Sequence, residues 1–384
     1  MSALLDTFAA QRQNLEGLAQ ESRLRRLIPR SGLDFSSNDY LGLASCAELA
    51  SAIRDAIARG VPVGSGGSRL LRGNHEEHER LESEAAHLFG TESALYFSTG
   101  YAANSTLLST LPQRGDLILA DELIHASAHE GLRLSRSEHL FARHNDSADF
   151  AKLADTWRAK GGTGRIWLAV ESLYSMDGDL APLDELSAIA DERDAILIVD
   201  EAHALGVFGS QGLGAAEHLS GRENVLRLVT CGKALGCEGA LLCCPAIVRD
   251  FLVNRGRAFV FSTAPSPVMA AAVRASLLLV QSRPDRREKL WRNVRLANEA
   301  LAPLGLSPSG SQIIPIILRD DQRAMDAATA LQAKDFDVRG IRPPTVPPGT
   351  SRLRVSITLN VTEEDIRSLF HELANVLEAA QPAL

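Results

Sequence analysis

The 384-residue sequence lacks several features by which secreted, membrane and nucleic-acid-binding proteins are recognised. Its five cysteines form no paired framework, and the adjacent two in ALLCCP are typical of a buried strand rather than of metal ligation, which indicates a reducing cytoplasm. No run of about 18 apolar residues occurs and the N-terminal stretch has no signal-peptide core, so we expect neither membrane spanning nor secretion. A net charge of -8 argues against non-specific nucleic-acid binding.

What the sequence does contain is the pattern of an α/β enzyme. Helical stretches alternate with short apolar runs, namely SALYFS, DLILAD, RIWLAVE, AILIVDEAH, LRLVTCG and GALLCC. Continuous apolar strands separated by helices predict a mostly parallel central sheet that is covered on both faces. After Pro267 the pattern changes to long helices around SQIIPIIL and RLRVSIT, which predicts a smaller α+β domain. We expect an N-terminal helix and arm over residues 1–50, a large domain over 51–280 and a small one over 281–384.

Polar residues follow two of the apolar runs directly. Ligands of parallel sheets lie at the carboxyl ends of the strands, so Asp200 and Lys233 are candidates for one site. A buried carboxylate needs a partner, and a protonated heterocyclic nitrogen is one; a desolvated lysine favours imine formation with an aldehyde. The alternatives are a helix-capping Asp200, a core His203 and a surface lysine in a turn. The combination of amine and carboxylate predicts pyridoxal phosphate (PLP) as cofactor.

Further polar residues around these runs complete the predicted site. In YFSTGYAAN, a strand leads into small residues at a helix start, which suits a phosphate group but also an ordinary N-cap. His125 is a candidate for stacking on a flat ring, against the alternative of a structural histidine. Glu171 is expected only to support its loop. The remaining candidates are hydroxyl donors: Ser175 for a phenolate, and Thr230, Ser262 and Thr263 for the phosphate.

At this point the sequence resembles a known family. The segments DFSSNDYLGL, GSGGSRLL, STGYAAN, HAS, ESLYSMDGD, VDEAHALGVFG, VTCGKALG, FSTAPSP and IRPPTVPPGTSRLR, in this order, are similar to the α-oxoamine synthases. These are fold type I PLP enzymes that condense an amino acid with an acyl thioester and release carbon dioxide. The resemblance implies a homodimer with shared active sites. Within the family, FSSNDYLGL, SMDGD and IRPPTVPPGTSRLR are most similar to members that join L-alanine to a pimeloyl thioester in biotin synthesis.

The resemblance also implies roles for individual residues. Lys233 would form the imine with PLP and then move the α-proton, and Asp200 would pair with the ring nitrogen. The other implied contacts are His125 stacked on the ring and assisting decarboxylation, Gly100, Tyr101 and Thr230 by the phosphate, Ser175 and His203 near the ring oxygen, and Ser262 and Thr263 at the partner subunit's phosphate. On the substrate side, the resemblance implies that Arg354 binds the amino-acid carboxylate, with Arg25, Arg342 and Thr345 as further contacts.

Two kinds of alternative remain open. Another family reaction would use glycine with acetyl-CoA, glycine with succinyl-CoA, or serine with a long-chain acyl donor. A second alternative is a non-catalytic partner subunit, which the presence of both Lys233 and Asp200 disfavours. Coenzyme A and a carrier protein are both open as the carrier of the acyl group.

Overall fold

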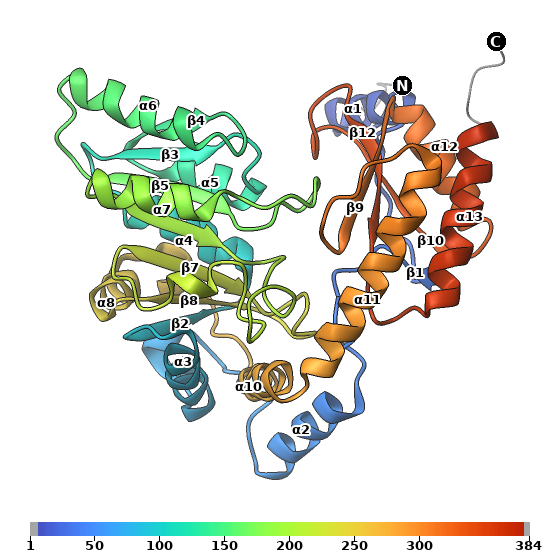
Figure 1. Ribbon diagram of the computed structural model, residues 1–384. Coiled ribbons are helices and arrows are strands. Elements are labelled where there is room, and N and C mark those ends of the chain that lie inside the picture. The colour runs from blue at the N-terminus through green and yellow to red at the C-terminus, as the bar shows by residue number, and fades with distance from the viewer. Residues whose placement is uncertain (1–6, 380–384) are drawn as a thin grey trace, which may run out of the picture. The chain divides into compact units, whose positions relative to one another are not determined.

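A computed structural model of the protein describes residues 7–379, which form two compact units (Figure 1). The larger unit comprises residues 38–175 and 179–290, and the smaller one residues 7–37, 176–178 and 291–379. The first six residues of the predicted N-terminal helix lie outside the described part of the chain, and the helix α1 spans Ala9–Gln20. Each unit is built around its own sheet.

The sheet of the larger unit has seven strands in the order β2-β8-β7-β6-β5-β3-β4. Only β8 is antiparallel to its neighbours, which confirms the predicted mostly parallel sheet. Six of the strands coincide with the six apolar runs. The seventh, β4, was not predicted, because it is an edge strand whose residues are mostly exposed and partly polar. The strands are β2 (Ser93–Phe97), β3 (Leu117–Asp121), β4 (Glu138–Ala142), β5 (Ile166–Glu171), β6 (Ile196–Asp200), β7 (Val225–Thr230) and β8 (Ala240–Cys244).

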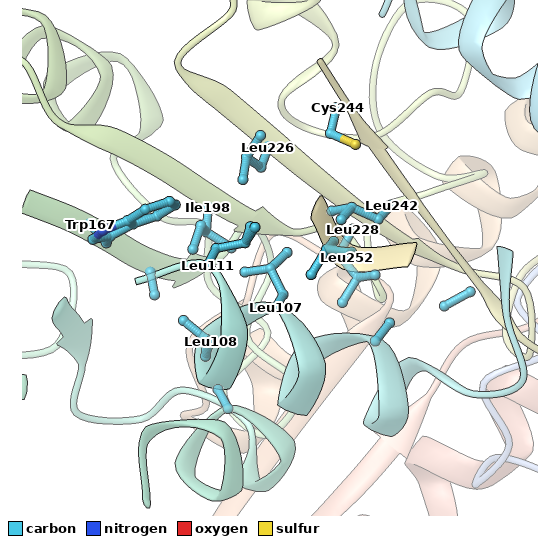
Figure 2. Close-up of a cluster of buried hydrophobic side chains, with 14 of the residues drawn as sticks. Leu107, Leu108, Leu111, Trp167, Ile198, Leu226, Leu228, Leu242, Cys244 and Leu252 are labelled. Atoms are coloured by element: carbon cyan, nitrogen blue, oxygen red, sulfur yellow. The ribbon is translucent and has the colours of Figure 1, made fainter. Parts of the chain in front are cut away.

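Helices cover both faces of this sheet. One face packs against α4 (Gly100–Thr110), α5 (Ala126–Leu134) and α8 (Ala246–Arg255). Figure 2 shows Leu107 and Leu108 of α4, and Leu111 directly after this helix, next to leucines of the strands. The opposite face packs against α6 (Ser147–Ala159) and α7 (Leu183–Glu192). Burial on both faces is the reason why these strands are continuously apolar instead of alternating.

Three further helices of the larger unit form a layer next to β2. Helix α3 (Glu76–Phe89) packs on β2, and α10 (Pro267–Ser282) packs on both α3 and α2 (Ala47–Ala58). The five-residue turn Arg69–Gly73 contacts the short helix α9 (Arg257–Val260). Helix α11 (Pro284–Leu301) contains the point at which the chain passes from the larger to the smaller unit.

The smaller unit is an α+β structure, as the sequence predicts. Its antiparallel sheet has the order β11 (Arg339–Ile341), β12 (Ser351–Ser356), β9 (Ile313–Arg319). Helix α12 (Asp321–Gln332) packs on this sheet and on α13 (Glu363–Ala379). A two-residue strand, β1 (Leu33–Asp34), pairs with β10 (Phe336–Asp337). Within residues 7–379, no helix is long and apolar enough to cross a membrane.

Candidate active site

A cavity of about 440 Å³ lies in the larger unit, at the carboxyl ends of the parallel strands. Its volume is within the range of about 300–1,000 Å³ that is usual for small-molecule sites. Glu171, Asp200 and Thr230, the last residues of β5, β6 and β7, contribute to its wall. Six of the ten predicted cofactor residues line it: Gly100, Tyr101, His125, Asp200, Thr230 and Lys233.

Lys233 follows β7 by three residues and is held by a histidine. Its Nζ lies 2.7 Å from Nε2 of His203, whose Nδ1 lies 2.7 Å from the Tyr40 hydroxyl. The turn that carries Lys233 ends at Gly236, where φ is +64° and a Cβ would come within 2.3 Å of the Ala44 nitrogen. Only glycine fits there, so the motif GKALG holds the turn tightly against the segment around Ala44. Lys233 is half-buried in the cavity wall, so the alternative of a surface lysine in a turn is wrong.

Asp200 is buried at the end of β6 and accepts two hydrogen bonds. Its Oδ2 accepts from Nδ2 of Asn104 at 2.6 Å, and its Oδ1 accepts from the Ala202 backbone N–H at 2.9 Å. A turn, not a helix, follows the strand, so Asp200 does not cap a helix. These two donors fix the position of the carboxylate in the cavity wall, where it can accept the N–H of a heterocyclic ring.

Glu171 lies beside Asp200 on the neighbouring strand β5. Burial, followed by the adjacent Asp200 charge, raises the pKa of Glu171 to about 8. Its carboxylate accepts the backbone N–H of Ser175. Its Oε1 has no hydrogen-bond partner among the described residues. The sequence analysis assigned Glu171 to loop support only, whereas the structure also places it in the cavity wall. Its position at the end of an apolar run, like that of Asp200, was the signal that could have revealed this.

The helix start predicted as a phosphate site also faces the cavity. Thr99 is the N-cap of α4, because its Oγ1 accepts the Ala102 backbone N–H at 3.0 Å. The next residue, Gly100, lies so close to β7 that a Cβ would come within 2.7 Å of Cγ2 of Thr230. The backbone N–H groups at this helix terminus and the helix dipole favour an anion. The start of α4 can therefore be capped by Thr99 and bind an anion at the same time.

His125 is the N-cap of α5 and lines the cavity. Desolvation by the surrounding protein lowers the pKa of His125. The Asp200 charge opposes this shift, and the Lys233 charge adds to it. The ring is therefore neutral at neutral pH. A neutral ring suits stacking on a flat heterocycle and can still donate one hydrogen bond.

Other predicted residues lie outside the lining of this cavity. Ser262 and Thr263 lie in the loop between α9 and α10. The substrate residues Arg25, Arg342, Thr345 and Arg354 belong to the smaller unit. There, Nη2 of Arg25 donates to Oγ1 of Thr345 at 3.1 Å, Nη2 of Arg342 donates to the Leu24 carbonyl at 3.3 Å, and the buried Arg354 of β12 donates to Oγ of Ser356 at 2.8 Å.

Several lining residues were not predicted from the sequence, and Asn104 and Ser127 are among them. Both occur inside quoted motifs, STGYAAN and HAS, but neither residue type indicates a role by itself. No group of three or more His, Cys, Asp or Glu residues in the described part of the chain could hold a metal ion.

These residues fit PLP on three structural grounds. The Lys233 amine and the Asp200 carboxylate line the same cavity. The start of α4 offers backbone N–H groups beside Gly100, which has no side chain to cover them. Oε1 of Glu171 has no hydrogen-bond partner among the described residues. Together they provide an imine-forming group, a partner for a ring nitrogen and an anion site.

Comparisons with known proteins agree with this chemistry. Residues 30–373 match the family described as aminotransferase class I and II. The 8-amino-7-oxononanoate synthase of Citrifermentans bemidjiense is 42% identical over 367 residues, which are 94% of this chain and 90% of that protein. The enzyme of the same name from Geobacter sulfurreducens is 41% identical over 345 residues, 88% of this chain and 87% of its own.

Solved structures give the same picture. A serine palmitoyltransferase variant from S. paucimobilis, solved with PLP and myriocin, superposes with a TM-score of 0.88 at 26% identity, covering 98% of this chain and 99% of that one. The 8-amino-7-oxononanoate synthase from Francisella tularensis has a TM-score of 0.75 at 28% identity, with 91% and 98% covered.

Proposed function

The chain belongs to the aminotransferase class I and II family, and on that premise we propose that it is a PLP-dependent acyltransferase of biotin synthesis. It condenses L-alanine with a pimeloyl thioester and yields 8-amino-7-oxononanoate, carbon dioxide and the free thiol carrier. Relatives that carry the name of this activity are about 40% identical over most of their length. The structural observation that carries the proposal is that the Lys233 amine and the Asp200 carboxylate line one cavity.

The reaction balances without an oxidant or reductant. A carbon–carbon bond forms between the α-carbon of alanine and the thioester carbonyl carbon, while the carbon–sulfur bond breaks and the thiol leaves. The original carboxylate departs as carbon dioxide, and a proton returns to the α-carbon. When bound, PLP supplies an aldehyde that binds amines and a ring that accepts the electron pair left at the α-carbon.

The chain's own residues would hold the cofactor and move protons. Lys233 would hold the aldehyde of the cofactor, and its Nζ would take the α-proton and return it. His203, 2.7 Å from this nitrogen, accepts a hydrogen bond from it and orients it. Asp200, whose carboxylate is fixed by two hydrogen-bond donors, would accept the N–H of the ring nitrogen. Gly100 and Tyr101 at the start of α4, with Thr230, bind the phosphate.

The remaining assignments are also part of the proposal. His125 stacks on the ring, Ser175 and His203 lie near the ring oxygen, and Arg354 binds the alanine carboxylate through its fork of N–H donors. Arg25, Arg342 and Thr345 are further substrate contacts. The hydrogen bond between Arg25 and Thr345 supports their assignment to one subsite.

We further propose a cytoplasmic homodimer in which Ser262 and Thr263 reach the phosphate of the partner subunit. Several apolar side chains of the larger unit support this, since Leu71 and Phe261 are 86% and 74% exposed and Tyr101, in the cavity wall, is 51% exposed. The turn Arg69–Gly73, which carries Leu71, contacts α9, and Phe261 follows α9 directly, so these two side chains lie on neighbouring segments. Exposed apolar side chains that lie together are typical of an interface. The five cysteines are all unpaired, which suits a reducing compartment. Sedimentation of the purified protein at micromolar concentration would test for the dimer.

The decisive experiment compares substrates and one variant. We expect product and free thiol only from L-alanine with pimeloyl-CoA or a pimeloyl carrier protein, and not from glycine or L-serine with acetyl-, succinyl- or palmitoyl-CoA. Lys233→Ala should lower kcat by a factor on the order of 10² to 10⁴, because it removes both the imine and the proton carrier. Lys160→Ala, at an exposed lysine after α6, is the matched control and should act like wild type. Turnover that survives Lys233→Ala would overturn the proposal.

The runner-up function is a different condensation of the same type. The serine palmitoyltransferases among the solved neighbours, with a TM-score of 0.88, favour it. In that case L-serine and palmitoyl-CoA would be the productive pair in the same assay.

A further inference from the structure

Two buried polar residues, Asn104 and Ser127, link Asp200 to His125 in the cavity wall. Asn104 lies on α4 and is 5% exposed; Ser127 lies in the first turn of α5 and is 1% exposed. Nδ2 of Asn104 lies 2.6 Å from Oδ2 of Asp200 and 3.1 Å from Oγ of Ser127. Oγ of Ser127 lies 2.7 Å from Nδ1 of His125. These contacts form a continuous chain from Asp200 to His125.

The direction of each hydrogen bond in this chain follows from chemistry. An ionised carboxylate only accepts, so the amide nitrogen of Asn104 must face Asp200. Its second N–H is then directed at the Ser127 oxygen, which accepts it. The hydroxyl proton of Ser127 is left to donate to Nδ1 of His125. The Ser127 backbone N–H donates to the same nitrogen at 3.2 Å. Nδ1 is thus an acceptor, and a neutral His125 carries its proton on Nε2.

The packing of the two helices holds the chain in place. Helices α4 and α5 make a close contact at Gly131, where a Cβ would come within 2.8 Å of the Leu108 Cβ and 3.1 Å of the Ser105 carbonyl oxygen. The absence of a side chain at this position lets Asn104 and Ser127 approach each other. Buried hydrogen-bond networks that are fully satisfied hold their members in one arrangement.

We propose that Asn104 and Ser127 are positioning residues, which orient His125 and fix its proton on Nε2. His125 then presents an N–H donor to a carboxylate or carbonyl oxygen of a ligand in the cavity that it lines. This role in turnover rests on the function proposed above, whereas the position of the proton is a property of the protein itself. The same hydrogen bonds connect the orientation of His125 to the Asp200 carboxylate.

The position of the proton can be measured directly. In the PLP-loaded protein labelled with ¹⁵N-histidine, the nitrogen shifts of His125, assigned by their loss in His125→Gln, should show the Nε2–H form at pH 8. Ser127→Ala should lower the ratio of the Nε2–H to the Nδ1–H form about fivefold, the value that corresponds to one neutral hydrogen bond. Ser127→Thr keeps the hydroxyl and should restore the ratio. Ser109→Ala, at a half-buried serine of α4, is the matched control.

Kinetics give the second measurement. Ser127→Ala should lower kcat/KM for the amino acid about fivefold while the PLP dissociation constant changes less than about twofold. If Ser127→Ala does not fold, Asn104→Ala replaces it, because loss of the amide donors lets the Ser127 hydroxyl turn away from Nδ1. Wild-type tautomer ratios in these variants would overturn the inference. A wild-type enzyme inactive on alanine, but with the predicted tautomer shift, would refute the proposed function alone.

Discussion

His144, in the loop between β4 and α6, offers the sharpest test of the electrostatics in this structure. Its Nδ1 lies 2.9 Å from Oδ1 of Asp121, and its Nε2 lies 2.8 Å from Oδ2 of Asp179. Burial alone would lower its pKa, but the hydrogen bonds and charges of the two carboxylates outweigh this and raise the pKa of His144 to about 10. We expect His144→Gln to destabilise the protein in a manner that depends on pH.

The size of the effect follows from the pKa shift. One pKa unit corresponds to about 1.4 kcal/mol, so a pKa raised from 6.5 to about 10 gives an upper limit of about 5 kcal/mol. Asp179 is 40% exposed, and water screens its charge, so we expect about 3 kcal/mol. Below pH 6.5, His144 is protonated in both the folded and the unfolded chain, and the contribution is fully present. Between pH 6.5 and 10 only the folded chain keeps the proton, so the contribution falls as pH rises.

The assay is urea-induced unfolding between pH 6 and pH 10, followed by tryptophan fluorescence. The difference in unfolding free energy between wild type and His144→Gln should be largest near pH 6 and should shrink toward pH 10. His218→Gln is the matched control, because His218 also contacts a carboxylate, Asp184 at 2.8 Å, but the pair is 49% and 86% exposed. Such pairs contribute about 0–1 kcal/mol. A difference for His144→Gln that stays constant across this pH range would refute the reasoning.

Two further predictions concern the cavity wall. Because the pKa of Glu171 is raised to about 8, its side chain is neutral at pH 7, and Glu171→Gln should bind PLP like wild type at that pH. The unfolding free energy of Glu171→Gln relative to wild type should increase from pH 4.5 to about 8 and then level off. A difference that does not depend on pH would contradict this. Gly100→Ala should weaken PLP binding about tenfold, because its Cβ displaces the start of α4 from Thr230, and Thr230→Ser in the same chain should recover the loss, as measured by titration of the apoprotein.

Much of the fold was determined by local sequence. Strands buried on both faces must be apolar throughout, so six strands of the large sheet were visible as apolar runs, and their alternation with helices predicted a mostly parallel arrangement. The exception is β8, which follows β7 without a helix in between and is antiparallel to it. The edge strand β4 was not visible, because exposed residues such as Glu138 and His139 carry no such pattern. Asp200 and Lys233 were found for the same reason as the strands: each follows an apolar run, and parallel strands bring their carboxyl ends to one edge.

Only the tertiary structure decided which side chains touch. The contact of Lys233 with His203, and the chain from Asp200 through Asn104 and Ser127 to His125, depend on how two loops and two helices pack. Asparagine and serine occur at many surface and capping positions, so their residue types do not reveal such a role. Differences of a few tenths of an ångström in the distance between donor and acceptor decide whether a hydrogen bond forms. When the two groups belong to segments far apart in sequence, packing and not local sequence pattern sets this distance.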